Sequence, residues 1–530
     1  MIIRVLALAA LVALAWSPVE GQAPKSGGSL NLWLREDLPQ GFAIHETATI
    51  STVWPAMPCF NNLVLFDPLK RVESADTVIG ELAERWSWQD GYRALVFFLR
   101  KDVTWHDGRP FTSRDVKATL DMLRESPDAP QRLRLNPRRG WYGNLEAVEA
   151  VDPHTVAVRL KRPQPSFLLM LASGYSPIYA AHVAPGSYRT GCVGTGPFKL
   201  KEWRKGEFVD YVKNPDYFVK GRPRLDSLRY LVIAERGTAM AAIRTGRVDV
   251  SFPGETTNAL ADQLRKAVPQ IVLTPASTNF ADNVIMNIKK PPFDNVKVRL
   301  AVSRAIDRRA LIQAAYQGGA VVGASLLPRP WGVWGLLDRD LAALPGYGKP
   351  ADEKAKARQL LAEAGFAPGT PLKVELLTRA IPAYVDVATF VLNELKLVGI
   401  EATLKTVETA QWHPLATRGD YQIGTNRTGI GLDDPDANFF ENYGCGSPRN
   451  YSYYCNEEVA KLVEQQSREL DAGKRLTIVY AIQKKLEDDA ARPILSWRVD
   501  SFARWPHVKN LLPHQSMYNW GRMQEVWVDR

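Results

Sequence analysis

The sequence has few of the residues and motifs that carry enzymatic or metal chemistry. Its 530 residues include four cysteines and seven histidines. No cysteine has a second cysteine or a histidine at the spacing of two to four residues that tetrahedral zinc sites favour. The chain also lacks the Gly-x-Ser-x-Gly turn of serine hydrolases and the paired histidines of zinc hydrolases. We therefore expect no catalytic residue, no metal site and no cofactor, although two distant carboxylates of an exported hydrolase stay open as an alternative.

Long hydrophobic runs are absent beyond the N terminus, so no transmembrane helix is predicted. Residues 1–21 contain Arg4, an apolar run over 5–16 and a small-residue stretch, which is typical of a cleaved signal peptide. No cysteine lies near the cleavage site, which argues against a bacterial lipid anchor. The sequence predicts export to the periplasm.

Charge of one sign is not concentrated anywhere in the chain. Lys and Arg number 67 against 57 Asp and Glu, a net charge of +10, but the basic residues are scattered. The densest patch is Arg132, Arg134, Arg138 and Arg139, in a loop bounded by prolines. This distribution does not favour a nucleic-acid partner.

In an exported chain, cysteines favour disulfides. Cys445 and Cys455 flank a short loop in which Gly446 and Pro448 allow the ends to meet, so we predict a bridge between them. For Cys59 and Cys192 the sequence leaves both the free and the bridged state open.

Short β-rich segments alternate with amphipathic helical segments. Residues 29–34 and 400–407 have the pattern of strands, and residues 115–124, 352–364 and 387–398 that of helices. A helix followed by glycine and then a strand, as around Gly399, is typical of α/β folds. We expect an α/β protein without a long flexible linker.

Seven blocks of turn and helix residues occur in a specific order. They are residues 97–116 with Trp105-His106-Asp107-Gly108, 193–198 with Gly194-Thr195-Gly196-Pro197, 213–223 with Asn214-Pro215-Asp216-Tyr217, 246–250, 298–308, 357–366, and Asp434-Pro435-Asp436. This order resembles the dipeptide/oligopeptide/nickel family of solute-binding proteins that serve ABC importers. The resemblance spans most of the mature chain.

The resemblance implies a periplasmic-binding-protein-like fold of two α/β lobes, joined by a hinge of crossover strands near residues 274–287. Lobe I would comprise residues 28–277 and 501–530, with an extra subdomain near 70–190, and lobe II residues 278–500. A peptide or peptide-like solute would bind in the cleft between the lobes, and an ABC permease would read the closed form. The protein would act as a monomer. The alternative functions are the exported carboxylate-dependent hydrolase and a periplasmic peptide-binding chaperone.

The resemblance also points to candidate ligand-binding residues. Trp412 matches a cleft tryptophan of the peptide binders, and Arg418 and Arg427 lie near positions that present arginines to a ligand carboxylate. A place in the core is the alternative for Trp412, and a solvated surface place for each arginine. The remaining candidates are Asn283 as a polar contact, Thr49 in the loop after the first strand, and Asp434 as a partner for an ammonium group.

One departure from the family pattern bears on the ligand. Peptide binders often carry an aspartate three positions before the Asp-Pro block to hold the ligand's ammonium group, and this chain has Gly431 there. This departure counts against an ordinary free-amine peptide, which nevertheless stays the leading ligand class; a nickel chelate, a glutathione-like peptide, an opine and an oligosaccharide are the alternatives.

Overall fold

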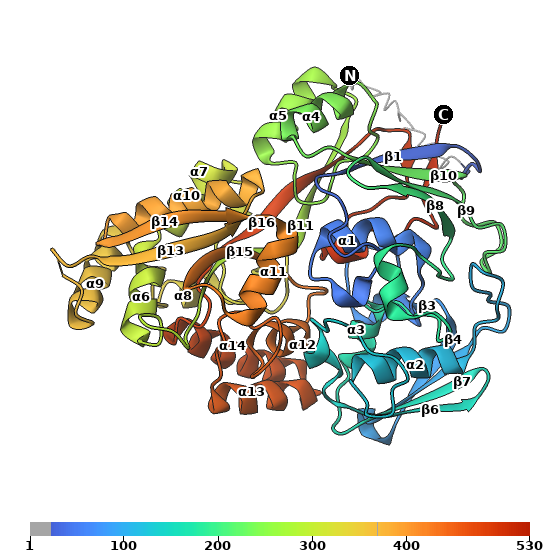
Figure 1. Ribbon diagram of the computed structural model, residues 1–530, viewed down its shortest axis with the longest axis horizontal. Helices are drawn as coiled ribbons and strands as arrows, with labels where there is room; N and C mark the ends of the chain where they lie inside the picture. Colours follow the sequence, from blue (N-terminus) through green and yellow to red (C-terminus); the bar gives the residue numbers. More distant parts are fainter. Residues whose placement is uncertain (1–22, 368) are drawn as a thin grey trace, which may run out of the picture.

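The computed structural model describes residues 23–367 and 369–530. The predicted signal peptide, residues 1–21, lies outside the described residues. Figure 1 shows two bodies side by side, with strands β11 (Val272–Met286) and β16 (Ile494–Arg504) running from one to the other. The predicted crossover near residues 274–287 is thus confirmed as β11, and β16 is its antiparallel partner.

The first lobe contains two four-stranded sheets. One has the order β1-β10-β9-β8, with β1 parallel to β10, and the other is antiparallel with the order β4-β5-β7-β6. Helix α2 (Ser113–Leu123) packs on β6. The strands are β1 (Ser29–Leu34), β10 (Ser227–Val232), β9 (Phe208–Lys213), β8 (Phe198–Arg204), β4 (Ala83–Gln89), β5 (Ala94–Leu99), β7 (Thr155–Leu160) and β6 (Leu145–Asp152).

The second lobe is built on a six-stranded sheet of order β12-β16-β11-β15-β13-β14. Its other strands are β12 (Ala320–Val321), β15 (Ile423–Gly429), β13 (Leu372–Arg379) and β14 (Ile400–Val407), and its helices include α6 (Val296–Ala305), α7 (Arg308–Tyr316), α9 (Pro350–Glu363), α10 (Pro382–Lys396), α11 (Thr409–Arg418), α13 (Glu457–Arg468) and α14 (Ala472–Asp488). β13 is parallel to both β14 and β15, so the carboxyl ends of these three strands meet at one edge.

The predicted helix starts follow local chemistry. Thr112 caps α2, and the Asp115 carboxylate accepts from the Thr112 backbone N–H at 2.8 Å, which completes a capping box. After α10 the chain turns at Gly399, whose φ of +94° disfavours any side chain, and β14 begins at the next residue. These elements confirm the alternation of helices and strands that the sequence predicted for an α/β fold.

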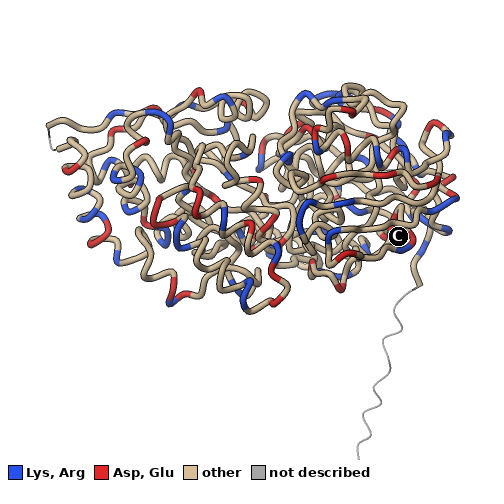
Figure 2. The backbone as a smooth tube through the Cα atoms, turned by 90° about the horizontal axis from the view of Figure 1, so that it is seen from below, with Lys and Arg blue, Asp and Glu red and all other residues tan. Residues whose placement is uncertain are grey.

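The two lobes are packed against each other. Ile430, Leu432 and Ala437, which follow β15 of the second lobe, belong to the hydrophobic core of the first. The chain after β16 returns to the first lobe, where β17 (Val508–Lys509) pairs with β18 (Trp527–Val528). The structure therefore has its lobes closed, while the exact lobe limits given above stay predictions. Figure 2 shows basic and acidic residues interspersed over both bodies.

Candidate functional site

A buried arginine without a counter-ion lies at the sheet edge that faces the first lobe. Arg379 is the last residue of β13 and is 3% exposed. Its Nη2 donates to the Tyr384 hydroxyl at 2.5 Å, whereas Nε and Nη1 are buried without a partner. No carboxylate forms an ion pair with it in the described part of the chain. Burial lowers the pKa of Arg379, so an anion brought to it would relieve a desolvated charge.

The neighbours of Arg379 add donors and aromatic walls. Its guanidinium carbon lies 4.1 Å from the ring centroid of Tyr384 and 5.6 Å from that of Trp412. Tyr384 lies in the first turn of α10 and Trp412 in the first turn of α11, the helices that follow β13 and β14. The buried Trp412 Nε1 has no hydrogen-bond acceptor.

His413 supplies a further donor. Its Nδ1 is 2.9 Å from the Tyr451 hydroxyl, and that hydroxyl accepts from Arg449 Nη1 at 2.7 Å. The hydroxyl hydrogen is therefore free to point at Nδ1, which leaves the hydrogen of the neutral ring on Nε2. Burial, with the charge of Arg379, lowers the pKa of His413 well below its usual value and keeps the ring neutral. Nε2 is buried and has no partner, so it is a second donor without an acceptor.

The first lobe contributes Arg35 and Glu36 from the turn after β1. Arg35 Nη1 donates to Glu255 Oε1 at 2.7 Å. Glu36 Oε1 accepts from Ser51 Oγ at 2.5 Å in its own lobe, and Glu36 Oε2 accepts from Thr409 Oγ1 at 2.8 Å in the second lobe. We call Arg35, Glu36, Arg379, Tyr384, Thr409, Trp412 and His413 the Arg379 cluster. It spans both lobes and is rich in unpartnered donors.

Two of the ligand-binding residues predicted from the sequence, Trp412 and Arg427, lie in or beside this cluster. Trp412 is part of it, fully buried. Arg427 is adjacent, with its guanidinium carbon 4.6 Å from the Tyr384 ring centroid, but Nε donates to Asp282 Oδ1 at 2.8 Å and Nη2 to Ala383 O at 2.8 Å. Arg418 lies apart from the cluster, with an exposed side chain whose Nε donates to Asp420 at 2.8 Å. The charges of Arg427 and Arg418 are thus already balanced within the protein.

The remaining predicted residues have structural partners. Thr49 is buried and caps helix α1 (Ile50–Ala56), its hydroxyl accepting from Ser51 N at 3.3 Å. Asn283 Nδ2 donates to Ala281 O and to Thr428 Oγ1, both at 2.9 Å, inside the sheet. Asp434 accepts from Arg475 Nη2 at 2.8 Å and caps the short helix α12 (Pro435–Asn438). None of these three forms a hydrogen bond or ion pair with a residue of the Arg379 cluster in the described part of the chain, and their ligand roles stay predictions.

Of the Arg379 cluster, sequence reasoning found Trp412 and missed the other six residues, Arg35, Glu36, Arg379, Tyr384, Thr409 and His413. Arg379 ends strand β13 just before helix α10, and ligands of α/β proteins bind at the carboxyl ends of strands, so this position in the sequence was a usable signal. The decisive property, the absence of a counter-ion, depends on the folded arrangement of distant residues.

A second set of contacts joins the lobes away from the Arg379 cluster. The buried carboxylate of Asp436 in α12 accepts through Oδ2 from Gln164 Nε2 at 3.0 Å and from Ser166 Oγ at 2.6 Å, both in the first lobe. Ser467 Oγ, in the second lobe, donates to the same oxygen at 2.6 Å. Trp141 Nε1 of the first lobe donates to Ala437 O at 2.9 Å. These hydrogen bonds hold the lobes in the closed arrangement.

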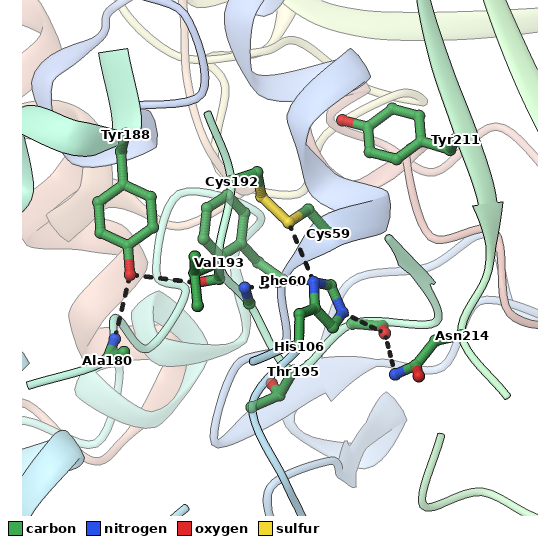
Figure 3. The surroundings of a disulfide bond; sticks show 12 residues. Cys59, Phe60, His106, Ala180, Tyr188, Cys192, Val193, Thr195, Tyr211 and Asn214 are labelled. Carbon is green, nitrogen blue, oxygen red and sulfur yellow. Dashed lines mark hydrogen bonds between the residues drawn. A yellow bond between two sulfur atoms is a disulfide. The ribbon is translucent and has the colours of Figure 1, made fainter. Parts of the chain in front are cut away.

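The structure contains two disulfides, Cys445–Cys455 and Cys59–Cys192. In Figure 3 the His106 ring lies against the second bridge, with Nδ1 3.7 Å from Cys59 Sγ and Nε2 3.0 Å from Gly196 O. Burial lowers the pKa of His106 to about 4, so the ring is neutral and Nε2 donates to the carbonyl. The triplet His106-Asp107-Gly108 therefore supports the packing of the first lobe.

The described residues 23–367 and 369–530 contain no group of three or more His, Cys, Asp or Glu arranged to hold a metal ion. Within the same residues, no helix has both the length and the apolar character needed to cross a bilayer.

Two α/β lobes joined by long strands, with unpartnered polar groups between them, define a two-lobe binding protein. The family model described as bacterial extracellular solute-binding proteins, family 5 Middle, matches residues 77–450. The match covers more than half of the chain, and the protein belongs to this family of solute-binding proteins.

Curated relatives agree with this assignment. The chain is 26% identical to the dipeptide-binding protein of Escherichia coli (strain K12), over 88% of each chain. It is 30% identical to the glutathione-binding protein GsiB of Escherichia coli O1:K1 / APEC, over 76% of this chain and 77% of that protein.

Solved structures share the fold. The periplasmic binding protein DppA of Helicobacter pylori, in complex with a peptide, has a TM-score of 0.83 at 22% identity and covers 96% of this chain and 99% of its own. The binding protein AgaA of A. tumefaciens R10, in complex with agropinic acid, has a TM-score of 0.82 at 24% identity. The match covers 95% of this chain and 99% of that chain. These likenesses establish the two-lobe architecture, and the predicted fold class is confirmed.

Proposed function

We propose that this protein captures a peptide or peptide-like solute between its lobes in the periplasm and delivers it to the permease of an ABC importer. The observation that carries the proposal is the Arg379 cluster, where a buried guanidinium has two donor nitrogens without an acceptor. A ligand carboxylate fits this site, because a guanidinium binds a carboxylate through two parallel hydrogen bonds. The ligands named for these relatives, a dipeptide, glutathione and agropinic acid, all carry carboxylates and support the same chemistry.

The arrangement of the cluster explains how binding would favour closure. Arg379, Trp412 and His413 belong to the second lobe, and Arg35 and Glu36 to the first. A solute that contacts both sets stabilises the closed state by its differential affinity for that state. The permease then distinguishes loaded from empty protein by the relative position of the lobes. The family supports a binding role, and we propose that the solute leaves the protein chemically unchanged.

A thermal-shift screen tests this function. Purified mature protein is heated with di- to pentapeptides, opines, metal chelates and small oligosaccharides, and a ligand at a hundredfold excess over its Kd adds about 2.7 kcal/mol to the free energy of unfolding. We expect stabilisation by peptides, its loss in Arg379→Met, and its retention in the surface control Arg418→Gln. The proposal would be overturned if only uncharged oligosaccharides stabilised the protein, or if peptides stabilised Arg379→Met as much as wild type.

A further inference from the structure

The disulfide Cys445–Cys455 closes a loop whose ends lie at the surface and whose middle is buried. Both cysteines are exposed, and their Cα atoms are 4.8 Å apart. Between them, Arg449 is 3% exposed and Tyr451 is 2% exposed. We call residues 445–455 the disulfide loop. Its S–S bond is accessible to solvent, although the side chains that it supports lie inside the second lobe.

One side chain of the disulfide loop joins the two ends of the loop from within. Asn450 Nδ2 donates to Gly444 O at 3.1 Å and to Tyr454 O at 2.6 Å, and these two residues directly precede the two cysteines. Asn450 N also donates to Ser447 O at 3.0 Å. The disulfide and these hydrogen bonds fix the same narrow base. Reduction of the disulfide leaves this base held by hydrogen bonds alone.

The middle of the disulfide loop packs behind two residues of the Arg379 cluster. The ring centroid of Tyr451 lies 5.3 Å from that of Trp412 at an interplanar angle of 82°, which is an edge-to-face contact. The Tyr451 hydroxyl lies 2.9 Å from His413 Nδ1. Trp412 Nε1 and His413 Nε2 are the two unpartnered N–H groups that the cluster has besides those of Arg379. The disulfide loop therefore supports both of these donors.

Arg449 determines the direction of the hydrogen bond between Tyr451 and His413. Arg449 Nη1 donates to the Tyr451 hydroxyl at 2.7 Å, and a guanidinium has no acceptor. The hydroxyl therefore accepts from Arg449 and donates its only hydrogen to His413 Nδ1, so His413 carries its hydrogen on Nε2. Without Arg449, the hydroxyl is equally able to accept from Nδ1–H, and Nε2 then becomes an acceptor.

A buried carboxylate holds Arg449 in place. Arg449 Nε donates to Glu441 Oε1 at 3.0 Å, and both side chains are 3% exposed. Glu441 also lies 3.8 Å from Arg138 Nη1, which belongs to the first lobe. The series Glu441, Arg449, Tyr451 and His413 lies wholly within the second lobe. The orientation of His413 therefore does not depend on lobe closure.

We infer that Arg449 and Tyr451 position His413 as a hydrogen-bond donor to the solute, and that the exposed Cys445–Cys455 bond makes this positioning sensitive to thiol reductants. The inference rests on the proposed function, since it assigns the support and the regulation of the same site. Arg449 and Tyr451 act through His413 and are positioning residues.

The chemical step is an exchange with a dithiol. The dithiol is oxidised to its own disulfide, the bond between Cys445 Sγ and Cys455 Sγ is reduced, and the two hydrogens of the dithiol end on the two cysteine thiols. In the other disulfide, Cys59 is fully buried and Cys192 is half-buried. Because a thiolate must reach a sulfur atom to attack it, a mild dithiol should reduce Cys445–Cys455 first.

Nitrogen NMR of His413 tests the positioning without any ligand. Protein labelled with 15N-histidine is prepared as wild type, as Tyr451→Phe and as the double variant Arg449→Met/Glu441→Gln, which removes the two paired charges together; His413→Gln assigns the resonances. Wild type should show Nδ1 without a hydrogen and Nε2 with one. The double variant should show a second population with the hydrogen on Nδ1, and Tyr451→Phe should shift the Nδ1 resonance to that of a nitrogen without a hydrogen bond.

The same spectra include reduced wild type. Its His413 Nδ1 resonance should shift in the same direction as in Tyr451→Phe. The positioning role is wrong if wild type carries the hydrogen on Nδ1, or if neither Tyr451→Phe nor the double variant changes the spectrum. The two variants are independent, so the test remains decisive should the double variant fold poorly.

Calorimetry with two tripeptide libraries, one with free termini and one amidated at the C terminus, measures the effect on binding. Oxidised wild type should bind the free library at least about tenfold more tightly. This ratio should fall by about threefold or more in the double variant, because Nε2 no longer acts only as a donor. It should fall likewise after treatment with dithiothreitol, under conditions in which mass spectrometry shows Cys445–Cys455 reduced and Cys59–Cys192 intact.

The double variant Cys445→Ser/Cys455→Ser is the matched control. It should bind like reduced wild type, and dithiothreitol should not change its affinity. If reduction leaves both the NMR spectrum and the ratio of affinities of wild type unchanged, the redox sensitivity is wrong and the peptide-binding function stands. If neither library binds oxidised wild type at millimolar concentration, the peptide-binding function itself fails, and the spectra alone decide the orientation of His413.

Discussion

Thr409 Oγ1 donates to Glu36 Oε2 at 2.8 Å, and the two residues belong to opposite lobes. The second carboxylate oxygen of Glu36 is held by Ser51 of its own lobe. The charge of Glu36 raises the pKa of Arg379, although burial has the larger and opposite effect. One carboxylate thus joins the first lobe, the second lobe and the cationic centre of the proposed binding site.

Removing this contact should weaken ligand binding without unfolding the protein. Thr409→Val keeps the shape of the side chain and removes the donor, and a hydrogen bond to a charged group contributes about 1.5–3 kcal/mol. Because the bond requires closed lobes, we expect Kd, measured by calorimetry, to rise by about tenfold or more. Thr477→Val is the matched control, since Thr477 bonds to Gly473 O within its own helix. An unchanged Kd for Thr409→Val would show that the bond does not contribute to closure.

The hydrogen bonds of Asp436 should affect the equilibrium between the open and closed states of the protein, although Asp436 does not contact the ligand. Ser166→Ala removes one donor of the first lobe and leaves the Ser467 donor in place. We expect a larger radius of gyration by X-ray scattering in the ligand-free state, and a weaker Kd with unchanged selectivity among ligands. Ser187→Ala, at an exposed position of the same lobe, serves as the control. A ligand-free variant as compact as wild type would contradict this role.

The disulfides should differ in their contribution to stability. Cys445 and Cys455 are 10 residues apart, whereas Cys59 and Cys192 are 133 apart. In the chain-entropy account, the short loop contributes about 2–3 kcal/mol and the long one close to about 5 kcal/mol. Urea unfolding of the double Ser variants of each pair measures the two values. A larger loss in the free energy of unfolding for the Cys445/Cys455 pair would mean that packing in the native state, rather than loop length, determines how much each disulfide stabilises the protein.

The predictability of the site depends on which interactions are local. The capping box at Thr112 and the glycine stop at Gly399 involve neighbours in the sequence, so the helices and strands of the α/β pattern could be predicted. Which arginines form ion pairs with carboxylates could not be predicted, because the partners are distant in the sequence. Asp282 and Arg427 face each other in register on β11 and β15 although they are 145 residues apart. The sequence analysis therefore named Arg427 and did not name Arg379, whereas in the folded protein Arg427 is paired with Asp282 and Arg379 has no counter-ion.

Arg379 and Arg427 should consequently respond in opposite ways to the same substitution. Arg427→Met leaves Asp282 buried without its cation, which typically costs about 3–5 kcal/mol. Arg379→Met removes a desolvated charge that has no counter-ion, so the free energy of unfolding should stay the same or rise. Ligand affinity should fall strongly in Arg379→Met, because the carboxylate loses its two donors. Denaturant unfolding and calorimetry on both variants measure the two quantities. Equal destabilisation of both variants would mean that Arg379 has a structural role and that the carboxylate of the solute binds elsewhere.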